Sequence, residues 1–350
     1  MKVKASAVDL FCGVGGMTHG LIKAGIRVNA GIDNDGTCQY AYESNNGARF
    51  IHSDVRQLSS ADVSTLYPLG DVKILVGCAP CQPFSPHTQK NDKRNEDERW
   101  RLLYAFGSLV KEIEPEIVSM ENVTQIENQK VFSDFVDGLK FLNYSVSWEA
   151  VYCPDYGIPQ TRTRLVLLAS KLGNIGLIPK THSQAHYRTV RNAIGKLEAL
   201  EDGEKSKKDP LHRAARLTSI NKRRIQESKP GRTWRDWNEE LRLRCHIKET
   251  GKRYVSVYGR MVWDKPAPTI TTQFYNYGTG RFGHPEQNRA LSLREGALLQ
   301  TFPRYYKFSD PKKPALFQQV AIHTGNAVPV RLGVIIGRSI INHLEGAFHD

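Results

Sequence analysis

The sequence predicts an α/β protein, with a mostly parallel β-sheet covered by helices and a smaller second domain inserted into it. Three observations predict this fold class. Short apolar strands alternate with amphipathic helices between residues 6 and 169, and the polar, basic segment 180–262 interrupts that alternation. An amphipathic helix of the first kind then returns at 328–344. Because this last helix belongs with the first part, we expect the basic segment to be inserted rather than appended.

The periodicity of the apolar residues predicts each element in turn. A strand at 6–10 precedes a glycine-rich turn and a helix at 17–24, and a strand at 28–32 precedes a helix at 37–44. The later elements are strand 74–76, helix 100–113, strand 117–120, helix 131–141, strand 144–151 and strand 165–169. Strands that alternate with helices in this way predict a parallel sheet, because parallel strands need a crossover connection.

Positive charge is concentrated in the interrupting segment. The net charge of the 350-residue chain is +13, and residues 180–260 hold 21 Lys and Arg against 10 Asp and Glu, a net charge of +11. A localised basic region is typical of a polyanion partner, most often nucleic acid. A merely soluble basic surface is the alternative.

The cysteines and the N-terminus bear on the cellular compartment. The six cysteines are scattered between Cys12 and Cys245, which favours an intracellular protein with reduced thiols over a disulfide scaffold. The N-terminus is too short and polar for a signal peptide, and no apolar run predicts a membrane span. We therefore expect a cytoplasmic protein without a membrane partner.

The segment GCAPCQPFS at 77–85 holds a candidate nucleophile. Cys81 lies on a proline-flanked turn after an apolar strand, and strand ends are where α/β sheets present reacting groups. Cys78 and Cys81 could instead form a redox pair or half a zinc site, but no further ligand pair at zinc spacing follows, so no metal is expected. Burial of Cys81 as a small apolar residue is another alternative, which the flanking prolines and the polar loop 86–99 disfavour.

The turn FCGVGG at 11–16 predicts a ligand site, because glycines let a ligand approach the backbone at the start of a helix. Asp33 ends the second strand about twenty residues later, where it could bind ribose hydroxyls. The NAD fingerprint fails because Thr18 stands at its third glycine. A nucleoside cofactor with a carboxylate in place of a pyrophosphate fits better, and a plain tight turn is the alternative.

Two further groups of polar residues flank apolar strands. Glu121 and Asn122 follow the run 117–120, and an acid at the end of a central strand suits proton transfer, although a helix cap or surface acid shows the same pattern. In QTRTR at 160–164, Arg162 and Arg164 fall on one face. Such arginines bind carbonyl or phosphate oxygens, or pair with nearby acids.

Taken in order, the motifs F-x-G-x-G, P-C-Q, E-N-V and Q-x-R-x-R resemble the DNA (cytosine-5) methyltransferases. Four later motifs match the same family: RFGHPE (281–286), LRE (293–295), LQTFP (299–303) and GNAVP (325–329). The resemblance covers almost the whole chain. It implies a Rossmann-like methyltransferase domain with a mixed, mostly parallel sheet at 1–180, completed by 318–350, and an inserted target-recognition domain with its hinge at 181–317.

The resemblance implies an enzyme of bacterial or phage type that moves a methyl group from S-adenosylmethionine to C5 of a cytosine, leaving S-adenosylhomocysteine. The target base must be flipped out of the double-stranded DNA to be reached. By similarity, Cys81 adds to C6 of that base, Glu121 contacts N3 and the exocyclic amine, and Arg164 contacts O2. Arg162 would lie beside the nucleophile, and Asn122 would hold the turn that carries it.

The implied cofactor pocket draws on both ends of the chain. Asp33 would bind the ribose and Asp54 the adenine amine, whereas Asn34 stands where many relatives carry a large side chain over the adenine ring. The residues implied in cofactor binding are Phe11, Gly13, Gly15, Asp33, Asn34, Asp54, Val55, Pro80, Asn326 and Val328.

The inserted basic domain would supply phosphate contacts and base-edge readout, and the loop 86–99 would close over the flipped base. Aromatic residues interleaved with the basic ones could equally form the core of that domain. The candidate DNA-binding residues are Gln82, Ser85, Lys90, Arg94, Arg223, Arg224, Arg232, Arg235, Arg253 and Arg260.

The expected partners are double-stranded DNA and, in a restriction–modification system, a cognate restriction endonuclease for the same site. An orphan methylation system would lack that endonuclease. We expect a monomer in the bacterial cytoplasm, associated with the nucleoid through DNA binding. A tRNA cytosine-5 methyltransferase on the same core, or a nucleic-acid-binding protein with a dead active site, are the alternative functions.

Overall fold

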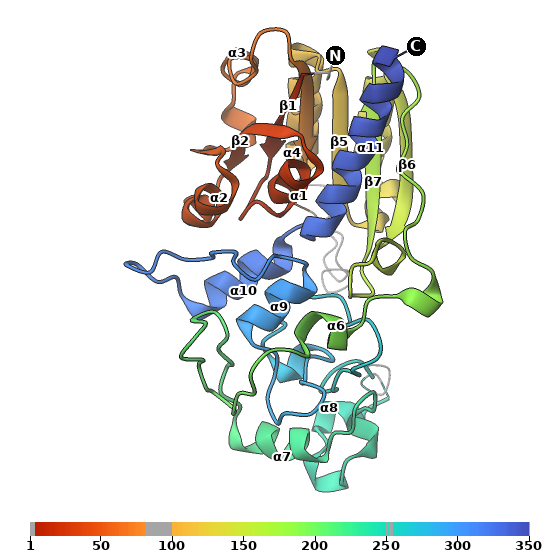
Figure 1. Cartoon of the computed structure of the whole chain (residues 1–350). Helices are drawn as coiled ribbons and strands as arrows, with labels where there is room; N and C mark the ends of the chain where they lie inside the picture. Colours follow the sequence, from red (N-terminus) through yellow and green to blue (C-terminus); the bar gives the residue numbers. More distant parts are fainter. Residues whose placement is uncertain (1–3, 81–99, 250, 252–254, 350) are drawn as a thin grey trace. The chain divides into compact units, whose positions relative to one another are not determined.

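The computed structural model describes residues 4–80, 100–249, 251 and 255–349 (Figure 1). The chain divides into two compact units. Unit 1 comprises Met1–Tyr152, Thr163–Thr181 and Ala327–Asp350, and unit 2 comprises Cys153–Arg162 and His182–Asn326. Both units are therefore assembled from segments that are distant in the sequence.

Unit 1 is built on a seven-stranded sheet in the order β3-β2-β1-β4-β5-β7-β6. The strands are β1 (Ala5–Leu10), β2 (Arg27–Asp33), β3 (Arg49–His52), β4 (Val72–Gly77), β5 (Ile117–Asn122), β6 (Ser145–Tyr152) and β7 (Thr163–Ser170). Neighbours among β1 to β5 run parallel, whereas β7 runs antiparallel to both β5 and β6. The predicted α/β fold with a mixed, mostly parallel sheet is confirmed.

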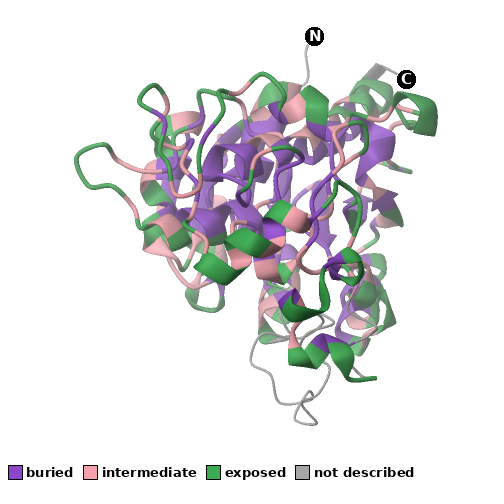
Figure 2. Ribbon diagram, turned by 90° about the horizontal axis from the view of Figure 1, so that it is seen from below, coloured by how far each residue is buried: buried purple, intermediate pink, exposed green. Residues whose placement is uncertain are grey.

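Helices cover both faces of this sheet. The helices of unit 1 are α1 (Gly16–Ala24), α2 (Gln39–Asn46), α3 (Ser60–Ser64), α4 (Trp100–Ile113), α5 (Lys130–Phe141) and α11 (Val330–His349). Leu10 lies in one apolar cluster with Phe106 of α4 and Phe135 of α5. On the other face, Ser170 of β7 hydrogen-bonds to His343 of α11 at 2.7 Å. The strands between these layers are largely buried (Figure 2).

The helices α1 and α11 pack closely because both carry glycine at their contact. A Cβ on Gly20 would lie 2.4 Å from the carbonyl oxygen of Val330, and a Cβ on Gly333 would lie 2.8 Å from that of Met17. These distances are shorter than any real carbon contact, so only glycine permits this approach. The C-terminal helix is thereby fixed against the helix that follows the first glycine-rich turn.

One stretch of the described chain, Phe317–Phe348, is long and apolar enough to cross a membrane by length and composition, although the apolar pattern of the sequence predicts no span. Its most apolar window has a mean hydropathy of 1.3, and 72% of that window is buried inside the protein. Leu332, Ile336 and Ile340 of α11 are fully buried. A core helix therefore accounts for the apolar composition.

Unit 2 consists of short helices joined by long connections. Its α-helices are α6 (Val190–Ile194), α7 (Ser219–Glu227), α8 (Arg244–Ile247), α9 (Leu293–Leu299) and α10 (Phe317–Asn326). Within its described residues, pairing between extended segments is limited to isolated bridges such as that between Pro230 and Arg260. Its apolar cluster contains Ile225, Trp234, Trp237, Leu241, Tyr277 and Ala290. The two tryptophans of the basic segment thus belong to the core.

Single-turn 3₁₀ helices complete both units. They are η1 (Gly36–Cys38), η2 (Val55–Gln57), η6 (Thr124–Asn128), η7 (Cys153–Tyr156), η8 (Gln184–His186), η9 (Trp234–Asp236), η10 (Glu239–Leu241) and η11 (Tyr277–Thr279). The expected strand at 117–120 extends to Asn122, because Glu121 and Asn122 pair with Val166 and Leu165 of β7.

Candidate active site

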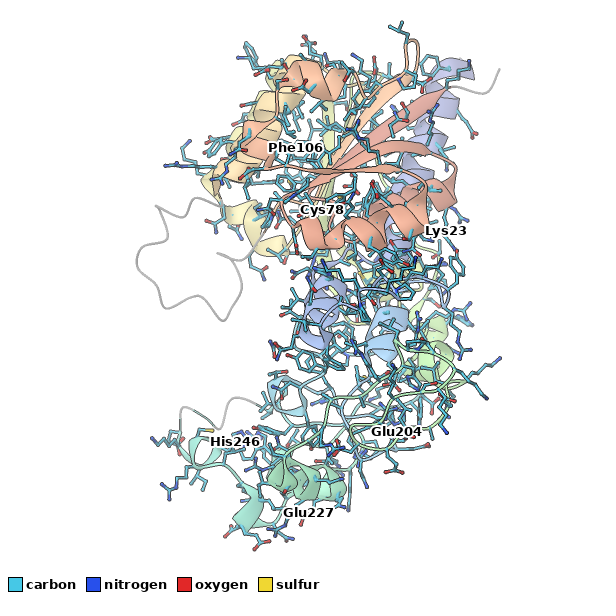
Figure 3. The ribbon with its side chains drawn as sticks, turned by 90° about the vertical axis from the view of Figure 1, so that its left-hand side faces the viewer. Lys23, Cys78, Phe106, Glu204, Glu227 and His246 are labelled. Atoms are coloured by element: carbon cyan, nitrogen blue, oxygen red, sulfur yellow. The ribbon has the colours of Figure 1, made fainter. Side chains whose placement is uncertain are left out.

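The carboxyl ends of three neighbouring strands bring the sequence motifs to one edge of the sheet. Leu10 of β1 is in register with Gly77 of β4, and Gly77 is in register with Met120 of β5. The turns that follow these strands therefore start side by side. Cys78, labelled in Figure 3, donates its backbone N–H to the Leu10 carbonyl at 3.3 Å. This edge is where open α/β sheets bind their ligands.

Asn122 ties the end of β5 to the turn that leads to Cys81. Its Nδ2 donates to the carbonyl oxygen of Ala79 at 3.1 Å, and its Oδ1 accepts from the N–H of Val123 at 2.9 Å. The asparagine is buried, with 2% of its surface exposed, so both polar ends of its amide are engaged. The backbone two residues before Cys81 is thus fixed against the central strand.

Gly77 is required where β4 ends. A Cβ at this position would lie 2.8 Å from Cε1 of Phe106, whose ring belongs to the core (Figure 3). Glycine lets the strand pass close to that ring before the chain turns. The position of the turn therefore depends on both Gly77 and Phe106.

Glu121 and Arg164 form an ion pair inside unit 1. The distance between Arg164 Nε and Glu121 Oε1 is 3.1 Å, and the two side chains are 16% and 7% exposed. Arg164 also donates from an Nη to the Thr163 carbonyl at 2.8 Å. Glu121 Oε1 makes no hydrogen bond to the described residues, so it can still accept one. The structure therefore brings the predicted acid and one predicted arginine together.

Arg162 belongs to unit 2, unlike Arg164. It is buried, with 4% of its surface exposed, and one Nη donates to the carbonyl of Ile270 at 3.2 Å. Its own carbonyl accepts from the N–H of Cys153 at 2.9 Å. One residue separates these arginines in the sequence, yet each belongs to a different unit.

The glycine-rich turn is held by the carboxylate of Asp33. Gly13 N–H donates to Asp33 Oδ2 at 2.8 Å, and Asp35 N–H donates to Oδ1 at 2.9 Å. The backbone is left-handed at Phe11, Gly13 and Gly15, with φ of 59°, 50° and 86°. A Cβ on Gly13 would meet nothing within 4 Å, so open space lies in front of the turn.

The other expected cofactor residues of unit 1 differ in their burial and in their hydrogen bonds. Asp54 caps η2 through the N–H of Arg56 at 2.9 Å, and the Arg56 guanidinium holds the pKa of Asp54 below its usual range. Val55 is buried in the core, Pro80 is exposed at the end of a described segment, and Asn34 is exposed with its carbonyl bonded by His52 Nε2 at 2.9 Å. Asp54 therefore already has a strong partner in Arg56.

The two expected cofactor residues near the C-terminus fall in different units. Asn326 is the exposed last residue of α10 in unit 2, and Val328 is a buried residue that precedes α11 in unit 1. Six predicted site residues lie outside the described part of the chain: Cys81, Gln82, Ser85, Lys90, Arg94 and Arg253.

Of the candidate DNA-binding residues, Arg223, Arg232 and Arg235 are exposed on unit 2. Arg223 forms an ion pair with Glu240, and Arg235 lies over the ring of Trp234 at 5.7 Å. Surface pairs of this kind contribute little to stability, so these guanidinium groups can exchange partners readily.

Arg224 is half-buried, and its side chain packs within unit 2. It lies over the rings of Trp237 and Tyr258 at 5.8 and 5.4 Å. Its Nε donates to the Leu241 carbonyl at 2.9 Å, and an Nη donates to Asn221 Oδ1 at 2.9 Å. Much of its hydrogen-bonding capacity is therefore used within unit 2.

Arg260 departs from the expected role in DNA binding. It is buried with 4% exposed, and its guanidinium donates to four backbone carbonyls at 2.7–2.8 Å. Those carbonyls belong to Ser228, Ile225, His284 and Gln287. The side chain joins segments that are far apart in the sequence, so the structure gives it a structural role instead.

Sequence reasoning missed Asp9 and treated Thr18 only as a missing glycine. Thr18 Oγ1 donates to Asp9 Oδ2 at 2.6 Å and lies 3.0 Å from the hydroxyl of Tyr42. Asp9 is fully buried, and this burial raises its pKa to about 7. The signal in the sequence was an acid inside an apolar strand, two residues before the glycine-rich turn.

Comparison with known proteins identifies the family. Residues 5–342 match the family model described as C-5 cytosine-specific DNA methylase. This chain belongs to that family. The predicted class of enzyme, a DNA cytosine-5 methyltransferase, is thereby confirmed.

Individual members of the family extend the comparison. The chain is 55% identical over 344 residues to the Type II methylase M.HgiDII of Herpetosiphon aurantiacus, covering 97% of this chain and 96% of that protein. It is 28% identical to the Type II methyltransferase M.Eco47II of Escherichia coli, covering 97% of this chain and 79% of that protein.

Solved structures share the fold at low sequence identity. A prophage-encoded protein of E. coli, assigned as a DNA modification methyltransferase, gives a TM-score of 0.73 at 20% identity and covers 98% of this chain and 100% of its own. A mutant of Spodoptera frugiperda DNMT2 gives a TM-score of 0.64 at 15% identity and covers 99% of this chain and 100% of its own. These likenesses extend over both units.

Proposed function

We propose that this methyltransferase modifies C5 of one cytosine in a specific double-stranded DNA site, with S-adenosylmethionine as methyl donor and Cys81 as covalent nucleophile. One observation carries the proposal. The hydrogen bond from Asn122 to Ala79 fixes the segment before Cys81 beside Glu121, which is buried at the same edge of the sheet. The turn that leads to Cys81 and the predicted acid therefore start at one edge of the sheet, which supports their action on one substrate.

The chemistry follows from the electron flow around the pyrimidine ring. The Cys81 thiolate forms a bond to C6, and the displaced electron pair makes C5 nucleophilic while charge develops at N3 and O2. By giving a proton to N3, Glu121 would offset the charge there, and Arg164, whose Nε lies 3.1 Å from Glu121 Oε1, would offset the charge at O2. After C5 has taken a methyl group, removal of the C5 proton by a base expels the Cys81 thiolate and restores the ring.

The glycine-rich turn fits a nucleoside methyl donor. Gly13 faces open space, and its N–H donates to the carboxylate of Asp33, the half-buried last residue of β2. Phe11, Gly15, Asn326 and Val328 complete the residues that would hold the donor. When bound, S-adenosylmethionine supplies a methyl group that C5 takes as S-adenosylhomocysteine leaves.

We assign cofactor binding and catalysis to residues 1–180 and 318–350, and target recognition to residues 181–317. The exposed residues Arg223, Arg232 and Arg235 support phosphate contacts by unit 2, since nucleic-acid binding depends strongly on such cations. The cytosine would be flipped to reach the catalytic edge. We propose a monomer that acts in the bacterial cytoplasm, with a restriction endonuclease for the same site as its cellular counterpart.

Methyl transfer from labelled S-adenosylmethionine to DNA tests the proposal, with bisulfite sequencing to locate the modified base. We expect Cys81→Ser to abolish transfer and retain DNA binding, whereas Cys78→Ala keeps transfer. Glu121→Gln should lower kcat by about 100-fold, as loss of an acid–base or charge-stabilising group does. Methylation by Cys81→Ser, or modification of RNA in place of DNA, would refute the proposal.

A further inference from the structure

Two buried glutamines of unit 2 lie in one chain of hydrogen bonds. Gln160 and Gln300 are both fully buried, and Gln160 Nε2 donates to Gln300 Oε1 at 2.7 Å. The residues are 140 positions apart in the sequence. A buried amide pair is retained only when its remaining polar atoms also find partners, so the rest of the network decides what the pair does.

On one side, Gln160 holds the backbone segment that binds Arg162. The N–H of Ile270 donates to Gln160 Oε1 at 3.1 Å, and the carbonyl of the same Ile270 accepts from Arg162 at 3.2 Å. Gln160 Nε2 also donates to the Leu299 carbonyl at 2.9 Å. The side chains of Gln160 and Arg162 therefore hydrogen-bond to the N–H and the carbonyl of the same residue, Ile270.

On the other side, Gln300 holds the end of α10. Its Nε2 donates to the carbonyl of Thr324 at 2.8 Å. The next residue, Gly325, packs so closely that an added Cβ would lie 2.4 Å from the carbonyl carbon of Thr271. Thr271 directly follows Ile270, so the network closes on the segment that binds Arg162. Asn326, a proposed cofactor residue, comes immediately after Gly325.

We propose that Gln160 and Gln300 are positioning residues for methyl transfer, which hold Arg162 and the end of α10 in a fixed relation. This inference rests on the proposed function, in which Arg162 lies beside the nucleophile and Asn326 contacts the methyl donor. Neither glutamine touches a reacting atom. They act by fixing two backbone segments. The carbonyl of Ile270 accepts the hydrogen bond from Arg162, and Asn326 follows Thr324 by two residues.

The orientation of the amides is specific. Gln160 must present an acceptor to Ile270 and donors to Leu299 and Gln300. Leucine in place of Gln160 keeps the volume but leaves these groups without partners. Misplacement of a catalytic group by about 1 Å can cost about 100-fold in rate, so the loss should appear in kcat. The binding of DNA through unit 2's exposed cations should not change.

The test compares Gln160→Leu and Gln300→Leu with the wild type in the methyl-transfer assay, with folded protein quantified by circular dichroism. We expect kcat to fall by about 100-fold in each, with DNA affinity in a gel-shift assay unchanged. The double variant should lose little more than either single one, because both act through one network. Gln318→Leu, at an exposed position of α10, is the matched control and should keep full activity.

A conservative variant keeps the inference falsifiable if Gln160→Leu does not fold. Gln160→Glu retains the acceptor for Ile270 and regains one donor when its carboxyl is protonated. Its kcat relative to the wild type should therefore rise as the pH falls. A constant ratio across pH, or wild-type kcat in folded Gln160→Leu, would overturn the inference while the proposed function stands. A wild type that transfers no methyl group would overturn both.

Discussion

Replacement of Asp9 by asparagine should change how the stability of this protein depends on pH. Asp9 is fully buried in β1, and its Oδ2 accepts a hydrogen bond from the Thr18 hydroxyl at 2.6 Å. Asparagine has almost the same shape and keeps an acceptor for Thr18, but it cannot ionise. Any cost of its added N–H group is the same at every pH, so the pH dependence isolates the carboxyl.

The magnitude follows from the pKa of Asp9. Burial raises that pKa from 3.8 to about 7. Between these values the native state keeps a proton that the unfolded state has lost, so the free energy of unfolding falls as the pH rises. At about 1.4 kcal/mol for each pH unit, the loss reaches about 4 kcal/mol by pH 7 and is constant above it. Asp9→Asn should lack this whole contribution.

Urea denaturation followed by circular dichroism between pH 4.5 and pH 8 measures the effect. The free energy of unfolding of the wild type, minus that of Asp9→Asn, should fall by about 1.4 kcal/mol for each pH unit up to pH 7. Asp137→Asn removes an exposed carboxylate of α5 and should give a curve parallel to the wild type. Parallel curves for Asp9→Asn as well would refute the reasoning.

Three further predictions concern stability and reactivity. Gly325→Ala should destabilise the protein by about 1–3 kcal/mol in thermal denaturation, because its Cβ would meet backbone at 2.4 Å, whereas Gly346→Ala, which meets nothing within 4 Å, should not. Arg260→Lys should cost about 3 kcal/mol in urea denaturation, because it leaves buried carbonyls without donors, and exposed Arg232→Lys should cost almost nothing. Cys78→Ala should retain methyl transfer and remove one thiol from titration of the native protein, and loss of transfer would make Cys78 part of the reaction.

Most of the fold of unit 1 could be predicted from the sequence. Its strands are short apolar runs and its helices have a period near 3.6, so local pattern and tertiary structure agree there. The antiparallel place of β7 was not visible in that pattern, since strand direction depends on the connection through unit 2. The short elements of unit 2 were also hidden, because its core comes from residues scattered between Leu217 and Ala290.

The basic residues show where sequence reasoning reaches its limit. Arg232 and Arg260 are the same residue type in the same basic segment, yet one is exposed and the other is fully engaged with backbone carbonyls. Trp234 and Trp237 interleave with these arginines but lie in the core. Composition gives the charge of the segment, whereas burial depends on which distant chain segments meet around each side chain.

The sequence by itself determined the family, the order of the motifs and the strand ends at which they stand, because residue type and spacing carry that information locally. Only the tertiary structure decided which of these residues meet. It placed Arg164 beside Glu121, joined Asn122 to Ala79, and gave Thr18 a buried partner in Asp9. These pairs join different strands or turns, so they depend on sheet register and packing rather than on local pattern.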